Sequence, residues 1–259
     1  MKIGVLYSGI YWQEFGLKTT GYPFELIYIY RKKVKFDRYD IIVIPKGINQ
    51  EFLKDCKENL EKFLDHGGTL ISFGEMDGQW LYGTHWKSSN KGQQIEIVAV
   101  EHELFRDIDD NMLNQWSKAV HGYFEAIPSG AKKLVTVKGD KNKCIAFIDD
   151  VSRKGTVLAM TMDPDYHTYA EIDYARHFFL NIMNWACSKS YFNSRKNISR
   201  KNGFESFRAN FKEQFNWKFI IIQIFVGVLL SLLFWYFQSG GKNIEKKIIP
   251  QTQNQLQKK

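Results

Sequence analysis

The chain of 259 residues contains only three cysteines, Cys56, Cys144 and Cys187, which lie far apart. Their number is odd and none belongs to a C-x-x-C pair, which argues against a disulfide framework and favours a reducing compartment. The chain also lacks G-x-x-x-x-G-K-[ST], G-x-G-x-x-G and G-x-S-x-G. The sequence therefore does not support nucleotide binding through either of the first two motifs, and the absence of the third argues against a serine hydrolase.

An excess of basic charge is missing from the first 187 residues. They carry 23 Lys and Arg against 25 Asp and Glu, whereas residues 188–259 carry 13 against 3, and the whole chain has a net charge of +8. A folded domain that binds nucleic acid needs its own basic face, so we expect no nucleic-acid partner.

The start of the chain, MKIGVLYSGI, lacks the apolar core and cleavage site of a signal peptide, and we expect the N-terminal part to stay cytoplasmic.

One long apolar run is present near the C-terminus. Residues 219–237, FIIIQIFVGVLLSLLFWYF, contain no charge, and Trp217, Trp235 and Tyr236 mark the two ends. A helix of this length spans about 28 Å, close to the ~30 Å of a bilayer core. The alternative, a buried core helix, is disfavoured because lysines flank the run. The sequence predicts a single transmembrane helix in the cytoplasmic membrane.

Both flanks of this run are basic. Residues 188–218 have eight bases against two acids, and one helical stripe runs through 204–215, formed by Phe204, Phe207, Phe211 and Phe215. We expect this segment to lie in the lipid headgroup region, the alternative being that the stripe packs back on the domain. Residues 238–259 form a polar basic tail.

Within the apolar run, small and polar residues recur on one helical face, at Gln223, Gly227 and Ser231. This spacing lets two helices approach closely and predicts a homodimer or a contact with a partner helix. The alternative is that Ser231 bonds its own helix and that the small residues are incidental.

Residues 1–187 alternate strand and helix signals. Apolar runs at 2–7, 24–30, 40–45, 69–74 and 155–162 predict strands, and Asn49 is placed to cap a helix that ends before Gly67 and Gly68. A further helix is predicted over 169–186, and residues 132–138 and 143–148 flank a turn, as in a hairpin. We therefore expect an α/β fold: a doubly wound, mostly parallel sheet with helices on both faces and a small antiparallel insertion.

The order of these segments resembles a known family. The strand YDIIVIPKG, a helix, a glycine pair and a strand that runs into G-x-x-x-G resemble the class I glutamine amidotransferase-like superfamily. HGYFEAIPSGAKKL, RKGTVLAMTMDPDYH and ARHFFLNIMNW are similar to its closing strands and last helix. The resemblance covers residues 1–187 and implies the α/β fold above.

The resemblance also implies where catalytic residues should stand. The family needs a cysteine in a strained G-x-C-x-G turn, but this chain has Gly74, Glu75, Met76, Asp77 and Gly78 there. The family's H-P-E segment is matched by Asp163, Pro164 and Asp165. A thioether cannot form a thiolate nucleophile. The resemblance thus implies a pseudoenzyme, with no catalytic residue and no cofactor.

Other chemistry at these positions is conceivable. If residues 163–167 were extended, Asp163, Asp165 and His167 would point one way and suit a metal ion, but Pro164 favours a polar turn, and we expect no metal. Glu75 and Asp77 either form a carboxylate pair for acid–base work or cap a helix after the turn. We expect the capping role.

Aromatic side chains crowd the stretch QWLYGTHW, with Trp80, Tyr82, His85 and Trp86 in the loop that follows the turn. Ligands of α/β proteins bind beyond the carboxyl ends of the strands, so these four are candidate ligand-binding residues. The alternative is a loop that packs its own aromatics over the sheet. The other histidines, His66, His102, His121 and His177, are expected to be structural or on the surface.

These expectations converge on a membrane-tethered, catalytically inactive amidotransferase-like domain that serves as a binding or scaffold subunit of a membrane-associated complex. Two alternatives remain open. One is a hydrolase or amidotransferase-type enzyme that uses Glu75, Asp77, Asp163 or His167, and the other is a ligand sensor.

Overall fold

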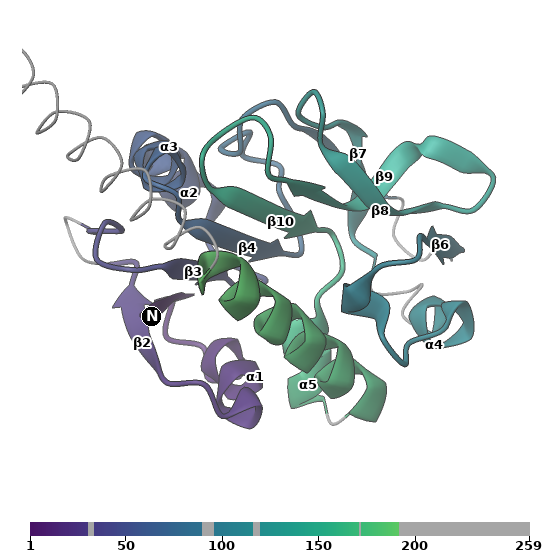
Figure 1. Ribbon diagram of the computed structural model, residues 1–259, viewed down its shortest axis with the longest axis horizontal. Coiled ribbons are helices and arrows are strands. Elements are labelled where there is room, and N and C mark those ends of the chain that lie inside the picture. The colour runs from purple at the N-terminus through teal and green to yellow at the C-terminus, as the bar shows by residue number, and fades with distance from the viewer. Residues whose placement is uncertain (31–33, 90–95, 116–119, 171, 192–259) are drawn as a thin grey trace, which may run out of the picture. The chain divides into compact units, whose positions relative to one another are not determined.

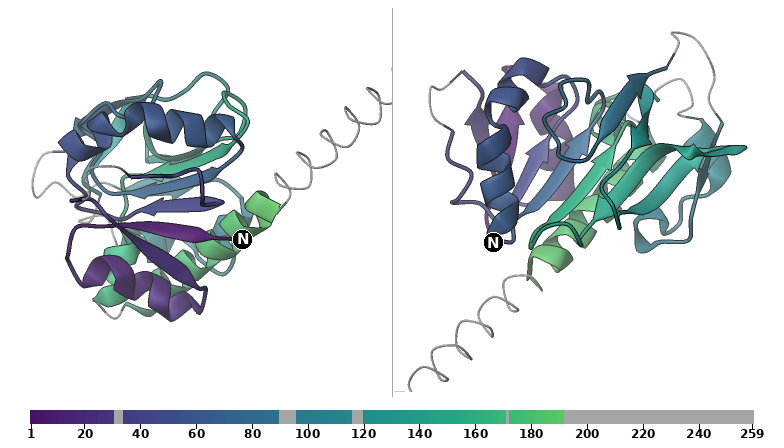
Figure 2. Two further views of the ribbon diagram at one scale, coloured as in Figure 1. Left: turned by 90° about the vertical axis from the view of Figure 1, so that its left-hand side faces the viewer. Right: turned by 90° about the horizontal axis from the view of Figure 1, so that it is seen from above.

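The computed structural model describes residues 1–30, 34–89, 96–115, 120–170 and 172–191 (Figure 1). Three layers make up this part of the chain, with a ten-stranded sheet between two sets of helices. Figure 2 shows α2 (Gln50–Asp55) and α3 (Lys57–Asp65) on one face of the sheet. The other face carries α1 (Trp12–Thr20), α5 (Pro164–Tyr169) and a helix over 173–191.

One half of the sheet is parallel. Its strand order is β2-β1-β3-β4-β10, with every pair parallel, for the strands β1 (Ile3–Tyr7), β2 (Phe24–Tyr28), β3 (Ile41–Ile44), β4 (Thr69–Phe73) and β10 (Thr156–Met160). Residues of β3, β4 and β10 are buried throughout, as strands covered on both faces must be. The apolar runs thus predicted these strands correctly.

The other half is antiparallel. It consists of β5 (His85–Ser88), β6 (Ile97–Ala99), β7 (Gly122–Ala126), β8 (Lys132–Val137) and β9 (Asp140–Asp149). The predicted hairpin is present as β8 and β9, and the α/β class with a mixed sheet is confirmed. The antiparallel part is larger than the small insertion expected, because the short strands β5 and β7 lack a clear alternation of apolar and polar residues.

The long strand β9 joins the two halves. It pairs with β10 from Ala146 to Asp149 and with β7 at Cys144, so β7 begins beside the end of β10. The Thr161 hydroxyl donates to the backbone oxygen of Gly122 at 2.8 Å across this junction. The start of β7 therefore lies at the same edge of the sheet as the carboxyl ends of the parallel strands.

Two helical predictions need correction in detail. Asn49 caps α2 by accepting the Phe52 N–H at 3.0 Å, as expected, but the helix is divided at Cys56 into α2 and α3. The helix predicted over 169–186 starts at 173 and runs to 191, and Tyr169 is instead the last residue of the separate helix α5. Loop residues 103–114 contain a 3-10 turn, Glu103–Phe105, and the short helix α4 (Asp110–Asn114).

Within the described residues, none of the helices combines the length and apolarity needed to cross a bilayer. The predicted span 219–237, the phenylalanine stripe 204–215, the proposed contact face of the span and the tail 238–259 lie outside the described residues.

Candidate functional site

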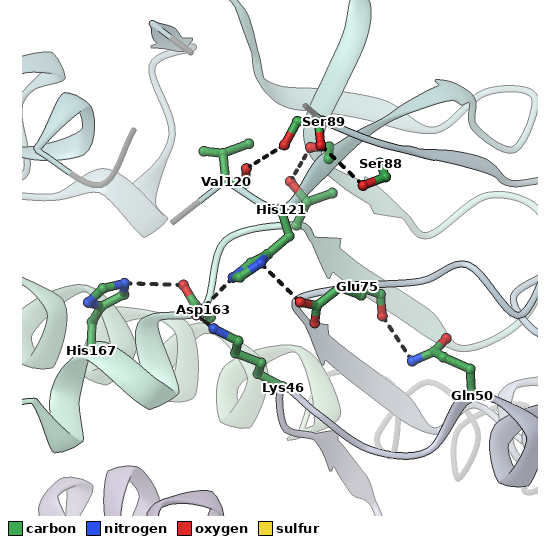
Figure 3. Close-up of polar contacts among 11 residues, drawn as sticks. Lys46, Gln50, Glu75, Ser88, Ser89, Val120, His121, Asp163 and His167 are labelled. Carbon is green, nitrogen blue, oxygen red and sulfur yellow. Dashed lines mark hydrogen bonds and ion pairs between the residues drawn. The ribbon is translucent and has the colours of Figure 1, made fainter. Parts of the chain in front are cut away.

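A group of charged side chains gathers at the carboxyl edge of the parallel strands. Lys46 follows β3, Glu75 follows β4, Asp163 follows β10, and His121 directly precedes β7 (Figure 3). Parallel strands end at one edge of a sheet, which is where open α/β sheets bind their ligands. We call His121, Glu75, Asp163, Lys46 and His167 the charge cluster.

His121 is the centre of the charge cluster and lies between two carboxylates. Its Nδ1 is 2.9 Å from Glu75 Oε1 and its Nε2 is 3.2 Å from Asp163 Oδ2. Burial opposes the charge on the ring, but the hydrogen bonds to Asp163 and Glu75 outweigh it and raise the pKa of His121 to about 9. Both ring nitrogens therefore donate at neutral pH, and the imidazolium has no lone pair with which to accept a proton.

Asp163 is the buried anchor of the charge cluster, with a side chain 1% exposed. Its Oδ2 accepts from Lys46 Nζ at 2.5 Å and from His121, and its Oδ1 is 3.3 Å from His167 Nε2. Burial alone would raise the pKa of Asp163. Hydrogen bonds from His121 and His167 and the charge of Lys46 outweigh burial and hold that pKa well below its usual range.

Asp165 lies two residues further on, and its pKa is shifted in the opposite direction. It is also buried, and its Oδ2 accepts the backbone N–H of Lys46 at 2.9 Å. Its Oδ1 is enclosed with no hydrogen-bond partner among the described residues. Burial, and secondly the negative charge of Asp163, raise the pKa of Asp165 to about 7. This carboxyl group is therefore neutral in mildly acidic solution.

The turn 74–78 carries Glu75 into the charge cluster. Gly74 has a φ of 81°, and a Cβ there would lie 3.0 Å from Lys46 Cγ, so glycine is needed at this close approach. Gln50 holds the turn by donating to the backbone oxygen of Glu75 at 3.0 Å. Met76 is 2% exposed and packs in the core on the α2 and α3 face of the sheet, while Asp77 is exposed.

The capping role expected for Glu75 and Asp77 is wrong. No helix follows the turn, because residues 75–84 run through bends and turns into β5. The carboxylate of Glu75 bonds His121 instead, and this hydrogen bond lowers the pKa of Glu75.

The extended arrangement considered for Asp163, Asp165 and His167 is also not adopted. Asp163 is the residue before α5, Pro164 opens that helix, and His167 lies one turn further on, so the three residues form no alternating row. Among the residues that the structure describes, no three His, Cys, Asp or Glu side chains are arranged to hold a metal ion.

The three cysteines lie elsewhere and are not activated. Cys56 and Cys144 are buried, and burial raises the pKa of their thiols to about 11 and about 12. Burial also raises the pKa of the half-buried Cys187. A nucleophilic thiol needs a lowered pKa, so none of the three resembles one.

The four candidate ligand-binding residues of the aromatic loop contact the protein itself. Trp80 is buried, and its indole N–H donates to Gln50 Oε1 at 3.0 Å. Tyr82 donates to Asp149 at 2.5 Å, Trp86 packs against the core, and the exposed His85 pairs with Glu125 at 3.2 Å. His85 and Trp86 lie on β5 and not in the predicted loop, and ligand binding by the four residues stays a prediction.

Two members of the charge cluster, His121 and Lys46, were missed by sequence reasoning. His121 was expected to be structural or on the surface, but its place beside Asp163 was not predicted, because it depends on β9 bringing the start of β7 next to the end of β10. Lys46 stands in the strand-end segment Pro-Lys-Gly, and a polar residue in that position was the available signal. His66, His102 and His177 each contact nearby backbone, in keeping with the structural role expected.

No known family model matches the chain, and no curated protein matches its sequence. Among solved structures, a GMP synthase subunit protein from Thermoplasma acidophilum is similar at 16% identity and a TM-score of 0.53, covering 76% of this chain and 98% of that protein. A cytoplasmic protein of Salmonella typhimurium LT2 is similar at 12% identity and a TM-score of 0.50, covering 72% and 99%.

A β-galactosidase from Bacillus circulans sp. alkalophilus also matches, at 13% identity and a TM-score of 0.44, with 72% of this chain covered. Only 30% of that enzyme's length is covered, so this likeness carries no argument. At such identities similarity concerns the fold alone. The described domain has, at a coarse level, the fold of the class I glutamine amidotransferase-like proteins.

Proposed function

We propose that this chain is a catalytically inactive amidotransferase-like binding or scaffold subunit, tethered to the cytoplasmic membrane by residues 219–237. The observation that carries the proposal is Met76. It occupies the position of the nucleophile in the turn after β4, and its thioether is buried in the core. Position 76 therefore offers neither a thiolate nor a side chain that reaches solvent to act as the nucleophile in acyl transfer.

The state of His121 supports the same proposal. A general base must present a free lone pair to the proton it removes. Both nitrogens of His121 instead donate to carboxylates, and its pKa is raised to about 9. An imidazolium fixed on both sides holds strand ends together and does not accept protons at neutral pH.

Ammonia release from glutamine tests this proposal. We expect none from the unmodified chain, and none from Met76→Cys, because a thiol at this position would have no base to deprotonate it. Met76→Leu is the matched control for altered packing at the same position. Ammonia release by the unmodified chain would overturn the proposal.

The membrane tether is tested separately. Under the proposed topology, protease added to intact cells should spare residues 1–187. The positive-inside rule favours this orientation only weakly, since bases lie on both sides of the span. Digestion of the folded domain under these conditions would reverse the proposed orientation.

A second candidate is an enzyme that performs acid–base chemistry with Glu75 and His121. Their 2.9 Å contact is within the range for proton transfer, and Glu75 is the most exposed member of the charge cluster. The two candidates differ in a measurable way. An enzyme of this kind would lose its activity in both Glu75→Gln and His121→Gln, and its rate would follow the titration of these two groups.

A further inference from the structure

The charge cluster is layered from a buried anchor to an open rim. The side chain of Asp163 is 1% exposed, those of Lys46 and His121 are 21% and 24% exposed, and that of Glu75 is 37% exposed. Figure 3 shows Glu75 approaching the His121 ring from the side opposite Asp163. Solvent and solutes therefore meet Glu75 first.

The carboxylate of Glu75 is the most easily displaced member. Among the described residues it has one side-chain partner, His121 Nδ1, whereas Asp163 binds three side chains. The turn itself is held independently, because Gln50 bonds the backbone oxygen of Glu75 and not its carboxylate. The side chain can thus leave the ring while the turn stays in place.

What remains after such a movement is a binding site for an anion. The Nδ1–H of His121 would be open, and the positive charges of His121 and Lys46 would exceed the negative charge of Asp163 by one. Hydrogen bonds from a charged donor to a carboxylate are about twice as strong as neutral ones. A partly enclosed site strengthens them further, because screening by water is reduced.

We propose that Glu75 is the internal occupant of a carboxylate-binding site, and that a small molecule with a carboxylate group displaces it to bind His121 Nδ1. This inference rests on the proposed binding function and names the ligand class of that site. Ligand binding and release of the Glu75 side chain are coupled, since the incoming carboxylate takes the hydrogen bond from His121 that holds this side chain. Through Gln50 the same turn contacts Trp80.

The chain offers a matched control in a second histidine–glutamate pair. His85 Nδ1 lies 3.2 Å from Glu125 Oε2, with side chains 56% and 39% exposed. Glu125 also pairs with Lys87 Nζ at 3.1 Å, and no buried carboxylate among the described residues pairs with the His85 ring. Removal of Glu125 should therefore create no carboxylate site.

The test is an acetate titration of the full chain in mild detergent at pH 7. Ring nitrogens of the six histidines are labelled with ¹⁵N, and the His121 signal is assigned by its loss in His121→Gln. For Glu75→Ala we expect a saturable shift of this signal and a rise in the unfolding temperature, at an acetate concentration at least about tenfold below that needed by the unmodified chain. Glu125→Ala should behave like the unmodified chain, and Glu75→Ala with His121→Gln should not respond.

The proposal is overturned if Glu75→Ala responds to acetate no better than Glu125→Ala does. If Glu75→Ala does not fold, Glu75→Gln keeps the shape of the side chain and removes its charge, and it must still bind acetate more tightly than the unmodified chain. A response to inorganic phosphate without one to acetate would also overturn the carboxylate assignment. Ammonia release, by contrast, tests the proposed function and does not depend on these outcomes.

Discussion

The parallel and antiparallel halves of the sheet differ in how regularly they are built. Strands β3, β4 and β10 are buried at every position and pair without interruption. In the antiparallel half, the register shifts between β8 and β9 and between β5 and β7, and β5 is largely exposed. Both halves contribute side chains to the buried core, but burial is more uniform along the strands of the parallel half.

This difference explains where the charge cluster lies. It occupies the junction between the halves, where His121 of the antiparallel half reaches the strand ends of the parallel half. Apolar packing defines the parallel half up to its edge. At that edge, the charge cluster adds charged hydrogen bonds to the pairing of β9 with β10 that joins the two halves.

The largest effect should come from the anchor of that junction. Asp163→Asn leaves Lys46 and His121 without the buried charge they share, and we expect the free energy of unfolding to fall by about 3–5 kcal/mol. Asp165→Asn should cost less than about 1 kcal/mol at pH 6, because an amide resembles the neutral carboxyl group already present. Urea unfolding of both variants measures the difference. Equal losses would mean that burial alone, and not charge, distinguishes the two positions.

The next prediction compares the packing of the two halves. Leu158→Ala removes a fully buried side chain from β10, and should reduce the free energy of unfolding by about 2–5 kcal/mol. Val98→Ala, on β6, removes a side chain that is already 38% exposed, and should cost less than about 1 kcal/mol. The comparison fails if the β6 variant is destabilised as much as the β10 variant.

A smaller effect is expected from pH. The pKa of His121 is about 9 in the folded protein against 6.5 for an ordinary histidine. Its ion pairs therefore stabilise fully below pH 6.5, and this contribution is lost as the pH rises through about 9. Between pH 7.5 and 9, above the titration of Asp165, the unfolding temperature should drop by several degrees. In His121→Gln this drop should shrink, and an unchanged slope would contradict the assignment.

The smallest effect concerns helix caps in the two halves. Asn49 accepts the Phe52 N–H at 3.0 Å at the start of α2, and Asp109 accepts the Met112 N–H at 2.8 Å at the start of α4. Each alanine variant should cost about 0.5–2 kcal/mol. Similar losses would show that the halves differ in packing and not in local capping. A loss at Asn49 several times that at Asp109 would show that capping differs as well.

Much of the parallel half was predictable because each strand carries its own signal. A strand buried on both faces needs an unbroken apolar run, and residues 40–45, 69–74 and 155–162 show one. Asn49 is a local signal of the same kind, because a capping residue predicts where a helix starts. The division at Cys56 and the separation of α5 from the helix that starts at 173 were not predicted from the apolar pattern.

The charge cluster was predictable only in part. The resemblance pointed to Glu75 and Asp163 as site positions, but their partners are distant in the sequence. His121 lies 42 residues from Asp163, and Lys46 lies 117 residues from it. The His121 contact arises because β9 pairs end to end with β10 and β7, and the Lys46 contact arises because β3 and β10 end at the same edge of the parallel half. Neither arrangement leaves a periodic trace in the sequence.

The position of β10 has a consequence for the order of folding. This strand comes late in the chain, yet it lies between β4 and β9 in the middle of the sheet. During synthesis the first four strands emerge well before it, and β4 keeps one open edge until residues 156–160 arrive. Such long-range pairing slows folding, and an unpaired edge invites contact with other chains. A nascent chain that stalls before residue 156 would therefore expose an apolar strand edge that the finished protein hides completely.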